Sequence, residues 1–193
     1  PIDHALVGRV AEAFFDHPMS GPGLLKRLLE KYGYTVGVIE QPQKAADVAV
    51  LGKPRLFFGV TSGAIDSMVR NYTPMKKERA LDDHARGVGD VKDRAVIVYT
   101  NWLKQSFKGT PIILGGTEST LRRFSHYDYW ENRVRKPLLV ESKADLLVYG
   151  NGEKQILEIA QRLKTKQDLH NIKGTCEMIK ELPEKMQKNT VML

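Results

Sequence analysis

The sequence predicts an α/β domain with a doubly wound, mostly parallel sheet flanked by helices, of the Rossmann or flavodoxin-like kind. Short, densely apolar runs without polar alternation end in glycine or a polar turn, as strands covered on both faces do. Amphipathic helical patterns fill the gaps between these runs. Strands and helices therefore alternate along the chain, which is the order of a doubly wound sheet.

Five apolar runs are predicted as strands. The first is the weakest, and each of the other four contains or ends in glycine. Because neither face of these runs is polar, helices should cover both sides of the sheet. The runs lie at residues 5–10, 36–39, 56–60, 112–116 and 146–150.

Apolar residues at three- and four-residue spacing predict the helices. Four leucines at 24–29 share one helical face, and Gly33 ends that helix just past its last turn. The apolar stretch 95–99 is compatible with a strand, but the helical spacing continues beyond it, so we predict a helix from about Asp93 to Phe107. The other predicted helices lie at 65–69 and 156–163.

The domain organisation follows from the distribution of apolar residues over the 193 positions. Residues 1–179 are predicted to form one α/β domain, and 180–193 a polar tail or linker. Within the domain, residues 71–91 are polar and charged and are predicted to form a long excursion or lid. Because the chain begins at Pro1 rather than Met, we expect a cut or processed fragment.

Composition excludes several classes of protein. A hydrophobic content of 41% with 16 glycines is ordinary for a globular domain and excludes a largely disordered chain. The net charge of +7 favours anionic partners, without selecting nucleic acid. The single cysteine, Cys176, cannot form an internal disulfide or hold a zinc or iron–sulfur site alone. We therefore expect a cytoplasmic protein, and the lack of an 18-residue apolar run predicts no membrane partner.

Four glycine-containing turns stand between a predicted strand and a predicted helix. In an open α/β sheet, ligands bind outside the carboxyl ends of the strands, at such turns. Any one turn has a purely conformational explanation, but four together indicate a crevice. The turns are 16–23, 60–63, 113–119 and 149–153. From them we take as candidate ligand-binding residues Asp16, His17, Thr61, Gly115, Gly116, Thr117, Glu118, Ser119, Gly150, Asn151 and Gly152.

Common catalytic and nucleotide motifs are missing. The sequence contains neither the Gly-x-Gly-x-x-Gly dinucleotide fingerprint nor a phosphate loop ending in Gly-Lys-Ser/Thr. No paired carboxylates, catalytic triad or metal-ligand cluster can be identified, so catalytic residues are unassigned and no metal site is predicted. A free-standing enzyme is the least favoured class, and whether this chain catalyses a reaction by itself stays open.

The segment 121–136 mixes arginines with aromatic residues, and two interpretations are open. It can stack bases and neutralise phosphates, which makes a nucleic-acid-binding or protein-interaction module the alternative function. The favoured interpretation is an amphipathic helix with packed aromatics and solvated arginines, because no nucleic-acid motif accompanies the segment. A salt-dependent shift with RNA would distinguish the two.

Several multi-residue strings, in order from about Asp16 to Met178, resemble the YgiQ family of radical SAM proteins. They include the segments that begin at Asp16, Tyr34 and Leu51 and the turns at Gly115 and Tyr149. The resemblance adds His126 and Tyr127 to the candidate ligand-binding residues. Further matching segments are 68–73, 121–123, 126–130 and 142–147.

The resemblance implies a long protein with an N-terminal domain similar to cobalamin-binding domains, followed by a radical SAM barrel. The barrel's Cys-x-x-x-Cys-x-x-Cys motif is absent from this sequence. The resemblance therefore implies an accessory domain that positions substrate or a corrinoid-like ligand, with the barrel of the same polypeptide as its partner. A 4Fe-4S cluster and S-adenosylmethionine are implied for the full-length protein only, so we expect the isolated chain to bind no cluster.

Two details of ligand binding are also expected. Cobalamin domains that supply a lower cobalt ligand use Asp-x-His-x-x-Gly, and the string from Asp16 to Gly21 has the wrong spacing. A corrinoid should therefore bind without a protein imidazole on cobalt. At Gly116 we expect an ordinary φ and close ligand approach, rather than a positive φ that only glycine tolerates.

Overall fold

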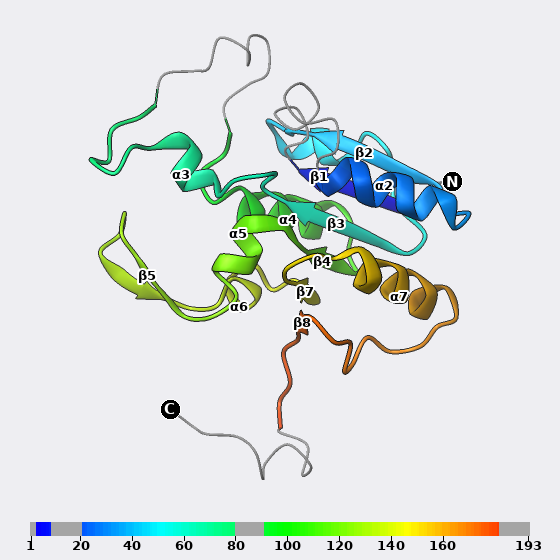
Figure 1. Ribbon diagram of the computed structural model, residues 1–193. Coiled ribbons are helices and arrows are strands. Elements are labelled where there is room, and N and C mark those ends of the chain that lie inside the picture. Colours follow the sequence, from blue (N-terminus) through cyan, green and yellow to red (C-terminus); the bar gives the residue numbers. More distant parts are fainter. Residues whose placement is uncertain (1–2, 9–20, 80–90, 182–193) are drawn as a thin grey trace.

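The computed structural model describes residues 3–8, 21–79 and 91–181. In this part of the chain a six-stranded sheet has the order β2-β1-β3-β4-β7-β8 (Figure 1). The first five of these strands are parallel and β8 is antiparallel to β7. Counted along the parallel strands, the order is 2-1-3-4-5, the flavodoxin-like order. The strands are β1 (His4–Gly8), β2 (Val36–Glu40), β3 (Phe57–Thr61), β4 (Ile112–Leu114), β7 (Leu146–Val148) and β8 (Thr175–Cys176). The predicted fold class is confirmed.

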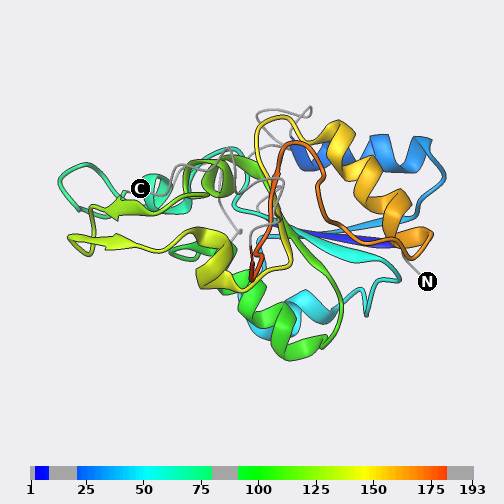
Figure 2. The same cartoon turned by 90° about the horizontal axis from the view of Figure 1, so that it is seen from below.

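Helices cover both faces of the sheet (Figure 2). On one face lie α2 (Gly21–Lys31) and α7 (Glu153–Lys164), which contact each other. The opposite face is covered by α4 (Ala95–Ser106), α6 (Leu138–Ser142) and the 3-10 helix η1 (Ala45–Ala49). The two-sided coverage explains why β4 and β7 are buried at every position.

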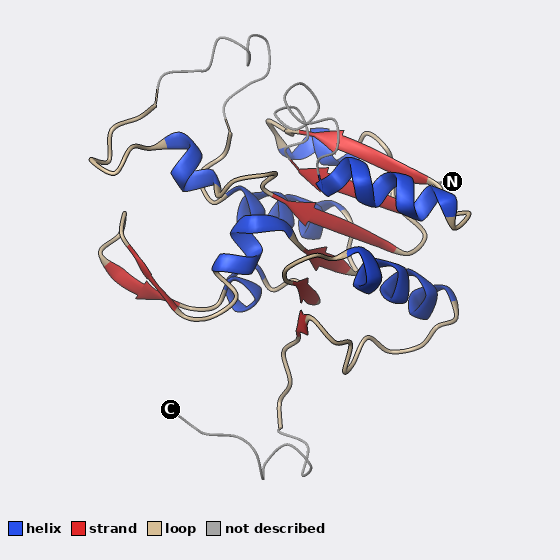
Figure 3. Ribbon diagram, viewed as in Figure 1, coloured by secondary structure: helices blue, strands red, loops and turns tan. Residues whose placement is uncertain are grey.

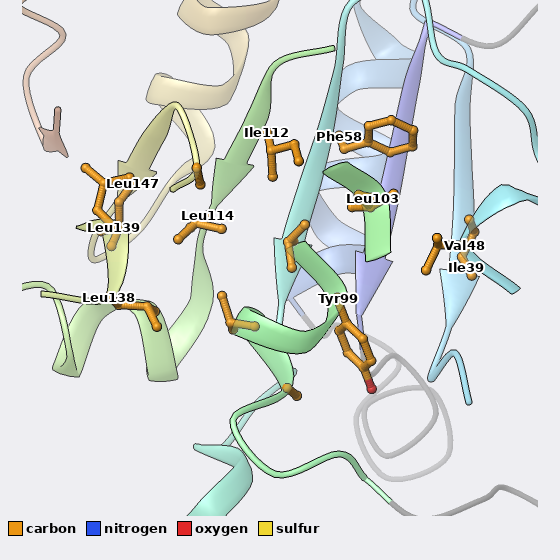
Figure 4. Close-up of a cluster of buried hydrophobic side chains, with 14 of the residues drawn as sticks. Ile39, Val48, Phe58, Tyr99, Leu103, Ile112, Leu114, Leu138, Leu139 and Leu147 are labelled. Atoms are coloured by element: carbon orange, nitrogen blue, oxygen red, sulfur yellow. The ribbon is translucent and has the colours of Figure 1, made fainter. Parts of the chain in front are cut away.

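Two apolar clusters, one on each face, form the core. Neighbouring strand residues contribute to opposite clusters, as the period of two in a strand requires: Phe57 packs toward α2 and α7, and Phe58 toward α4. In the cluster that contains Phe58, side chains of the strands surround Tyr99 and Leu103 of α4 (Figure 4). The predicted helix at Asp93–Phe107 is confirmed by α4, and its helical spacing presents Tyr99 and Leu103 to the sheet.

One element prediction is wrong. The segment 121–136 is not an amphipathic helix: α5 (Gly116–Leu121) ends at its start, and an antiparallel hairpin of β5 (His126–Asp128) and β6 (Arg133–Arg135) follows (Figure 3). The Asp128 carboxylate accepts hydrogen bonds from the backbone amides of Trp130 and Glu131, which closes the turn. An aspartate that bonds to amides two and three residues ahead favours a turn over a continued helix.

The polar segment after the third strand begins with α3 (Ser67–Asn71). The Asp66 carboxylate caps this helix by accepting hydrogen bonds from the amides of Met68 and Val69. A bridge between Tyr72 and Glu78 then folds residues 72–79 into a loop. The rest of the predicted excursion, and most of the predicted tail from residue 180, lie outside the described residues.

Candidate functional site

A cavity of about 250 Å³ opens at the carboxyl ends of β3, β4 and β7. This is the edge at which ligands bind in open α/β sheets. The start of α2 and the start of α7 close the cavity on one side, and the turn between β4 and α5 forms its floor. Its lining is Gly21, Pro22, Leu24, Leu25, Gly59, Val60, Thr61, Gly63, Ala64, Ile113, Leu114, Gly115, Gly116, Thr117, Val148, Gly150, Asn151, Gly152, Glu153 and Ile156.

The walls combine apolar side chains with bare backbone. Leu24 and Leu25 of α2 line the cavity together with Ile156 of α7 and residues at the ends of the strands. A Cβ added at Gly115 or Gly150 would meet no atom within 4 Å. Within the described lining, Glu153 is the single charged side chain. Such a cavity suits an apolar or planar group better than a bare phosphate, because no described cation faces it.

At the floor of the cavity, β3 and the β4–α5 turn are in close contact. The amide of Gly115 donates a hydrogen bond of 2.9 Å to the carbonyl of Val60. The hydroxyl of Thr61 accepts one of 3.1 Å from the amide of Gly63. Gly116 has φ +82° and lies against Thr61, so a Cβ there would overlap the Thr61 hydroxyl. The expectation of an ordinary φ at Gly116 is therefore wrong, because the chain must turn from an extended Gly115 into α5.

Most of the predicted site residues come together, and three of the four predicted turns contribute to the lining through them. Residues of the predicted site that line the cavity are Thr61, Gly115, Gly116, Thr117, Gly150, Asn151 and Gly152. Gly21 and Pro22, at the end of the remaining turn, also line it, whereas Asp16 and His17 lie outside the described residues. Whether these residues bind a ligand stays a prediction.

Four predicted residues are not part of the cavity lining. Glu118 and Ser119 are buried within α5, and the Ser119 hydroxyl has no hydrogen-bond partner among the described residues. His126 and Tyr127 lie on β5 of the hairpin, where the Tyr127 hydroxyl donates to the Asn132 side chain. Of α5, only Gly116 and Thr117 line the cavity.

Glu118 belongs to a buried polar cluster behind the cavity. Its carboxylate accepts a hydrogen bond of 3.0 Å from the amide of Ser67, whose hydroxyl in turn accepts one from the amide of Ala95. Burial, followed by the nearby Asp66 carboxylate, raises the pKa of Glu118 above its ordinary value. The neutral acid is thereby favoured at a position that joins α3, α4 and α5.

Arg122 joins this cluster to the hairpin. Its guanidinium donates two hydrogen bonds to the Asp66 carboxylate, of 2.6 and 3.0 Å. It also lies 3.3 Å from Nε2 of His126 and 3.9 Å from the Asp128 carboxylate. Such a bidentate arginine–carboxylate pair is strong and directional. The cluster therefore fixes the start of α3 against the end of α5.

Sequence reasoning missed the apolar wall of the cavity. Leu24 and Leu25 were interpreted only as the packing face of a helix, and Ile156 likewise. The signal that could have identified them is their place in the first turn after a glycine-containing loop, since helix starts lie at the carboxyl edge of a parallel sheet. Ala64 directly follows the turn at 60–63 and carried no such signal.

No cluster of three or more histidine, cysteine, aspartate or glutamate side chains among the described residues is arranged to hold a metal ion. Among the helices in the described ranges, none is both long enough and apolar enough to cross a bilayer.

The strand order, the two helical layers and the cavity define a flavodoxin-like α/β domain with a cavity at its carboxyl edge. Residues 2–193 match the family model described as radical SAM N-terminal, and the chain belongs to this family. It is 52% identical over 167 residues to a UPF0313 protein of Thermotoga neapolitana, and 48% identical over 175 residues to one of Methanocaldococcus jannaschii. The resemblance to the YgiQ family is confirmed.

These relatives are much longer than the chain. The alignments cover 84% and 88% of this chain but 30% and 29% of the two relatives. Among solved structures, the chain resembles the radical S-adenosylmethionine methyltransferase TsrM of Kitasatospora setae, solved with cobalamin and a [4Fe-4S] cluster bound. The TM-score is 0.60 at 17% identity, covering 93% of this chain and 28% of TsrM. At this identity the likeness establishes the fold.

Proposed function

We propose that this domain is the accessory domain of a longer radical SAM protein, and that its cavity positions substrate or a corrinoid-like ligand for a catalytic module elsewhere in the polypeptide. The observation that carries the proposal is the glycine-lined, apolar cavity at the carboxyl ends of β3, β4 and β7. The lengths of the relatives and the fold shared with TsrM support it. The single cysteine suits a cytoplasmic protein.

The residues present fit one part of a corrinoid. The open space at Gly115 and Gly150 allows a flat group to approach the backbone, and Leu24, Leu25 and Ile156 supply apolar walls. A cavity of about 250 Å³ suits a single heteroaromatic base, such as the benzimidazole at the end of the cobalamin nucleotide tail, rather than a whole corrin ring. We therefore assign the cavity to the tail.

A bound corrinoid would supply a carrier for an alkyl group. The role of this chain is to bind and orient. Leu24 and Leu25 would shield a bound tail from water, and the backbone at Gly115 and Gly116 would contact it. The described lining contains no histidine, so we expect cobalt to take no imidazole from it, and the bound cofactor to keep a base-off absorption spectrum.

The catalytic cluster belongs, in this proposal, to the longer protein. A radical SAM cluster needs three thiolates, whereas the chain has Cys176 alone. Burial also raises the pKa of the Cys176 thiol. Anaerobic reconstitution of the 193-residue chain should give no stoichiometric iron and no cleavage of S-adenosylmethionine.

The test compares two corrinoids on the full-length protein. Cobalamin carries the nucleotide tail and cobinamide lacks it, so cobalamin should bind at least tenfold more tightly in titrations followed by visible absorption. Gly115→Leu should fill the cavity and abolish this preference, whereas Gly115→Ala, with no atom within 4 Å of its Cβ, should retain most of it. Equal binding of the two corrinoids, or an unaffected Gly115→Leu variant, would contradict the assignment.

A further inference from the structure

Two loops that lie far apart in the sequence pack together beyond the carboxyl ends of the strands (Figures 1 and 3). One is residues 72–79 and the other is the β5–β6 hairpin; together they are called the arm. The Tyr129 hydroxyl donates a 2.9 Å hydrogen bond to the carbonyl of Pro74. The Lys76 ammonium lies 4.7 Å from the centre of the Tyr129 ring and bonds the carbonyl of Trp130.

Buried ion pairs fix the base of the arm. The Asp128 carboxylate is inaccessible to solvent, and the guanidinium of Arg94 lies 2.8 Å from it, with Arg122 at 3.9 Å and Arg135 at 3.8 Å. Arg135 also donates to both oxygens of Glu141. A two-stranded hairpin is marginally stable by itself. These ion pairs therefore hold the hairpin at a fixed place beside the domain.

The outer face of the hairpin is apolar and exposed. Tyr127 and Val134 are paired directly across the two strands, and their exposed fractions are 59% and 71%. Leu121, the last residue of α5, and Phe124, between α5 and the hairpin, are exposed as well. Exposed apolar side chains that gather on one rigid element indicate a surface made for contact.

The charges of the arm disfavour nucleic acid as the occupant. The arginines at its base are matched by the carboxylates of Asp66, Asp128, Glu131 and Glu141. Lys76 is engaged with Tyr129, and Arg133 on the outer strand with Glu131. Cations already paired inside the protein release few counterions on meeting phosphates. The surface that the outer face of the hairpin exposes is apolar.

We propose that the outer face of the hairpin, formed by Tyr127 and Val134, docks against the remaining part of the same polypeptide in the full-length protein. This inference rests on the proposed function, because it identifies the surface through which the accessory domain meets its catalytic module. The relatives, of which this domain covers about 30%, supply an occupant large enough to cover the face. Tethering in one chain makes such a contact effectively intramolecular.

The hairpin follows directly in the chain after a helix that lines the cavity. Gly116, the first residue of α5, lines the cavity, and the hairpin begins five residues after the end of that helix. Six helical residues span roughly 9 Å. A module seated on the hairpin would therefore stand on the side of the sheet at which the cavity opens.

The experiment places a photoreactive benzoylphenylalanine at Tyr127 of the full-length protein. After illumination and proteolysis, mass spectrometry should find cross-links to peptides C-terminal to residue 193, at a yield independent of protein concentration. Tyr32, which is 61% exposed and lies just past the end of α2, is the matched control position. Its yield should be at least fivefold lower. The same probe at Val134 gives a second, independent reading.

Other cross-linking results overturn the inference. Dimeric products that increase with concentration would assign the face to a second copy, and nuclease-sensitive products would assign it to nucleic acid. Equal yields from Tyr127, Val134 and Tyr32 would leave the hairpin without a docking role. Cobalamin and cobinamide binding to the same protein is measured in parallel. Retained preference for cobalamin without cross-links rejects the docking surface alone, and cross-links without that preference reject the cavity assignment alone.

Discussion

Gly116 and Thr61 are in direct contact across the floor of the cavity, so that a Cβ at residue 116 would overlap the Thr61 hydroxyl and lie 3.3 Å from the Thr61 Cβ. The contact joins the end of β3 to the start of α5. Together with φ +82° at Gly116, it leaves no room for any side chain other than that of glycine.

Gly116→Ala should destabilise the chain by about 1–3 kcal/mol, because a left-handed backbone conformation is strained for alanine and its Cβ must displace Thr61. The loss includes the hydrogen bond that the Thr61 hydroxyl accepts from the amide of Gly63. Chemical denaturation of the variant and the parent chain measures the difference in the free energy of unfolding. Thr61→Ala in the same chain should recover part of the loss by removing the overlapping oxygen.

Gly115→Ala is the matched substitution one residue earlier. Gly115 is extended, with φ −159°, and a Cβ there meets nothing within 4 Å. Stability should change by less than about 0.5 kcal/mol. A large loss at Gly115 together with a small one at Gly116 would show that the turn has been assigned the wrong conformation.

Arg122→Ala should cost about 3–5 kcal/mol of stability, because it leaves the buried Asp66 and Asp128 carboxylates without a shared cation. Arg133, whose side chain is 63% exposed, makes a surface pair with Glu131. Arg133→Ala should cost less than about 1 kcal/mol. Comparable losses from the two variants, measured by urea denaturation, would mean that the cluster at the base of the arm is not buried.

Glu118→Gln should change how stability depends on pH. Burial raises the pKa of Glu118 above its ordinary 4.5 in the folded chain, so its favourable contribution is complete below that value and is lost as pH rises through the folded pKa. Glutamine cannot ionise and can still accept the Ser67 amide. The variant should therefore gain stability over the parent as pH increases above 4.5, measured by denaturation at several pH values. A difference that shrinks with increasing pH would contradict the raised pKa.

Cys176 should react slowly with iodoacetamide in the folded chain. Burial raises the pKa of its thiol, which outweighs the opposing effect of Arg123, so little thiolate is present at pH 8. Labelling followed by mass spectrometry should become faster in denaturant. Equal rates in the two conditions would show that β8 does not protect the sulfur.

The fold class and the place of the cavity could be predicted from local patterns. The run at 112–114 is apolar at every position because helices cover both of its faces, and α7 follows a glycine-containing turn because parallel strands lead into helices at one edge. The carboxyl-edge rule then placed Thr61, Gly115 and Gly150 together, although they are 89 positions apart in sequence at the extremes.

The sequence by itself determined how the five parallel strands alternate with α2, α3, α4 and α7, since a strand or helix buried on known faces must carry the matching period of apolar residues. The hairpin and the conformation of Gly116 were decided by tertiary structure alone. Asp128 pairs with Arg94, 34 residues earlier, and Arg122 with Asp66, 56 residues earlier. Ion pairs between residues so far apart produce no periodic pattern in the local sequence. The arginines and aromatic residues of 121–136 were therefore predicted as a helix, although their ion pairs with distant residues hold them in a hairpin. In the same way, the close contact between Gly116 and Thr61 joins residues that are far apart in the sequence, and no local pattern records it.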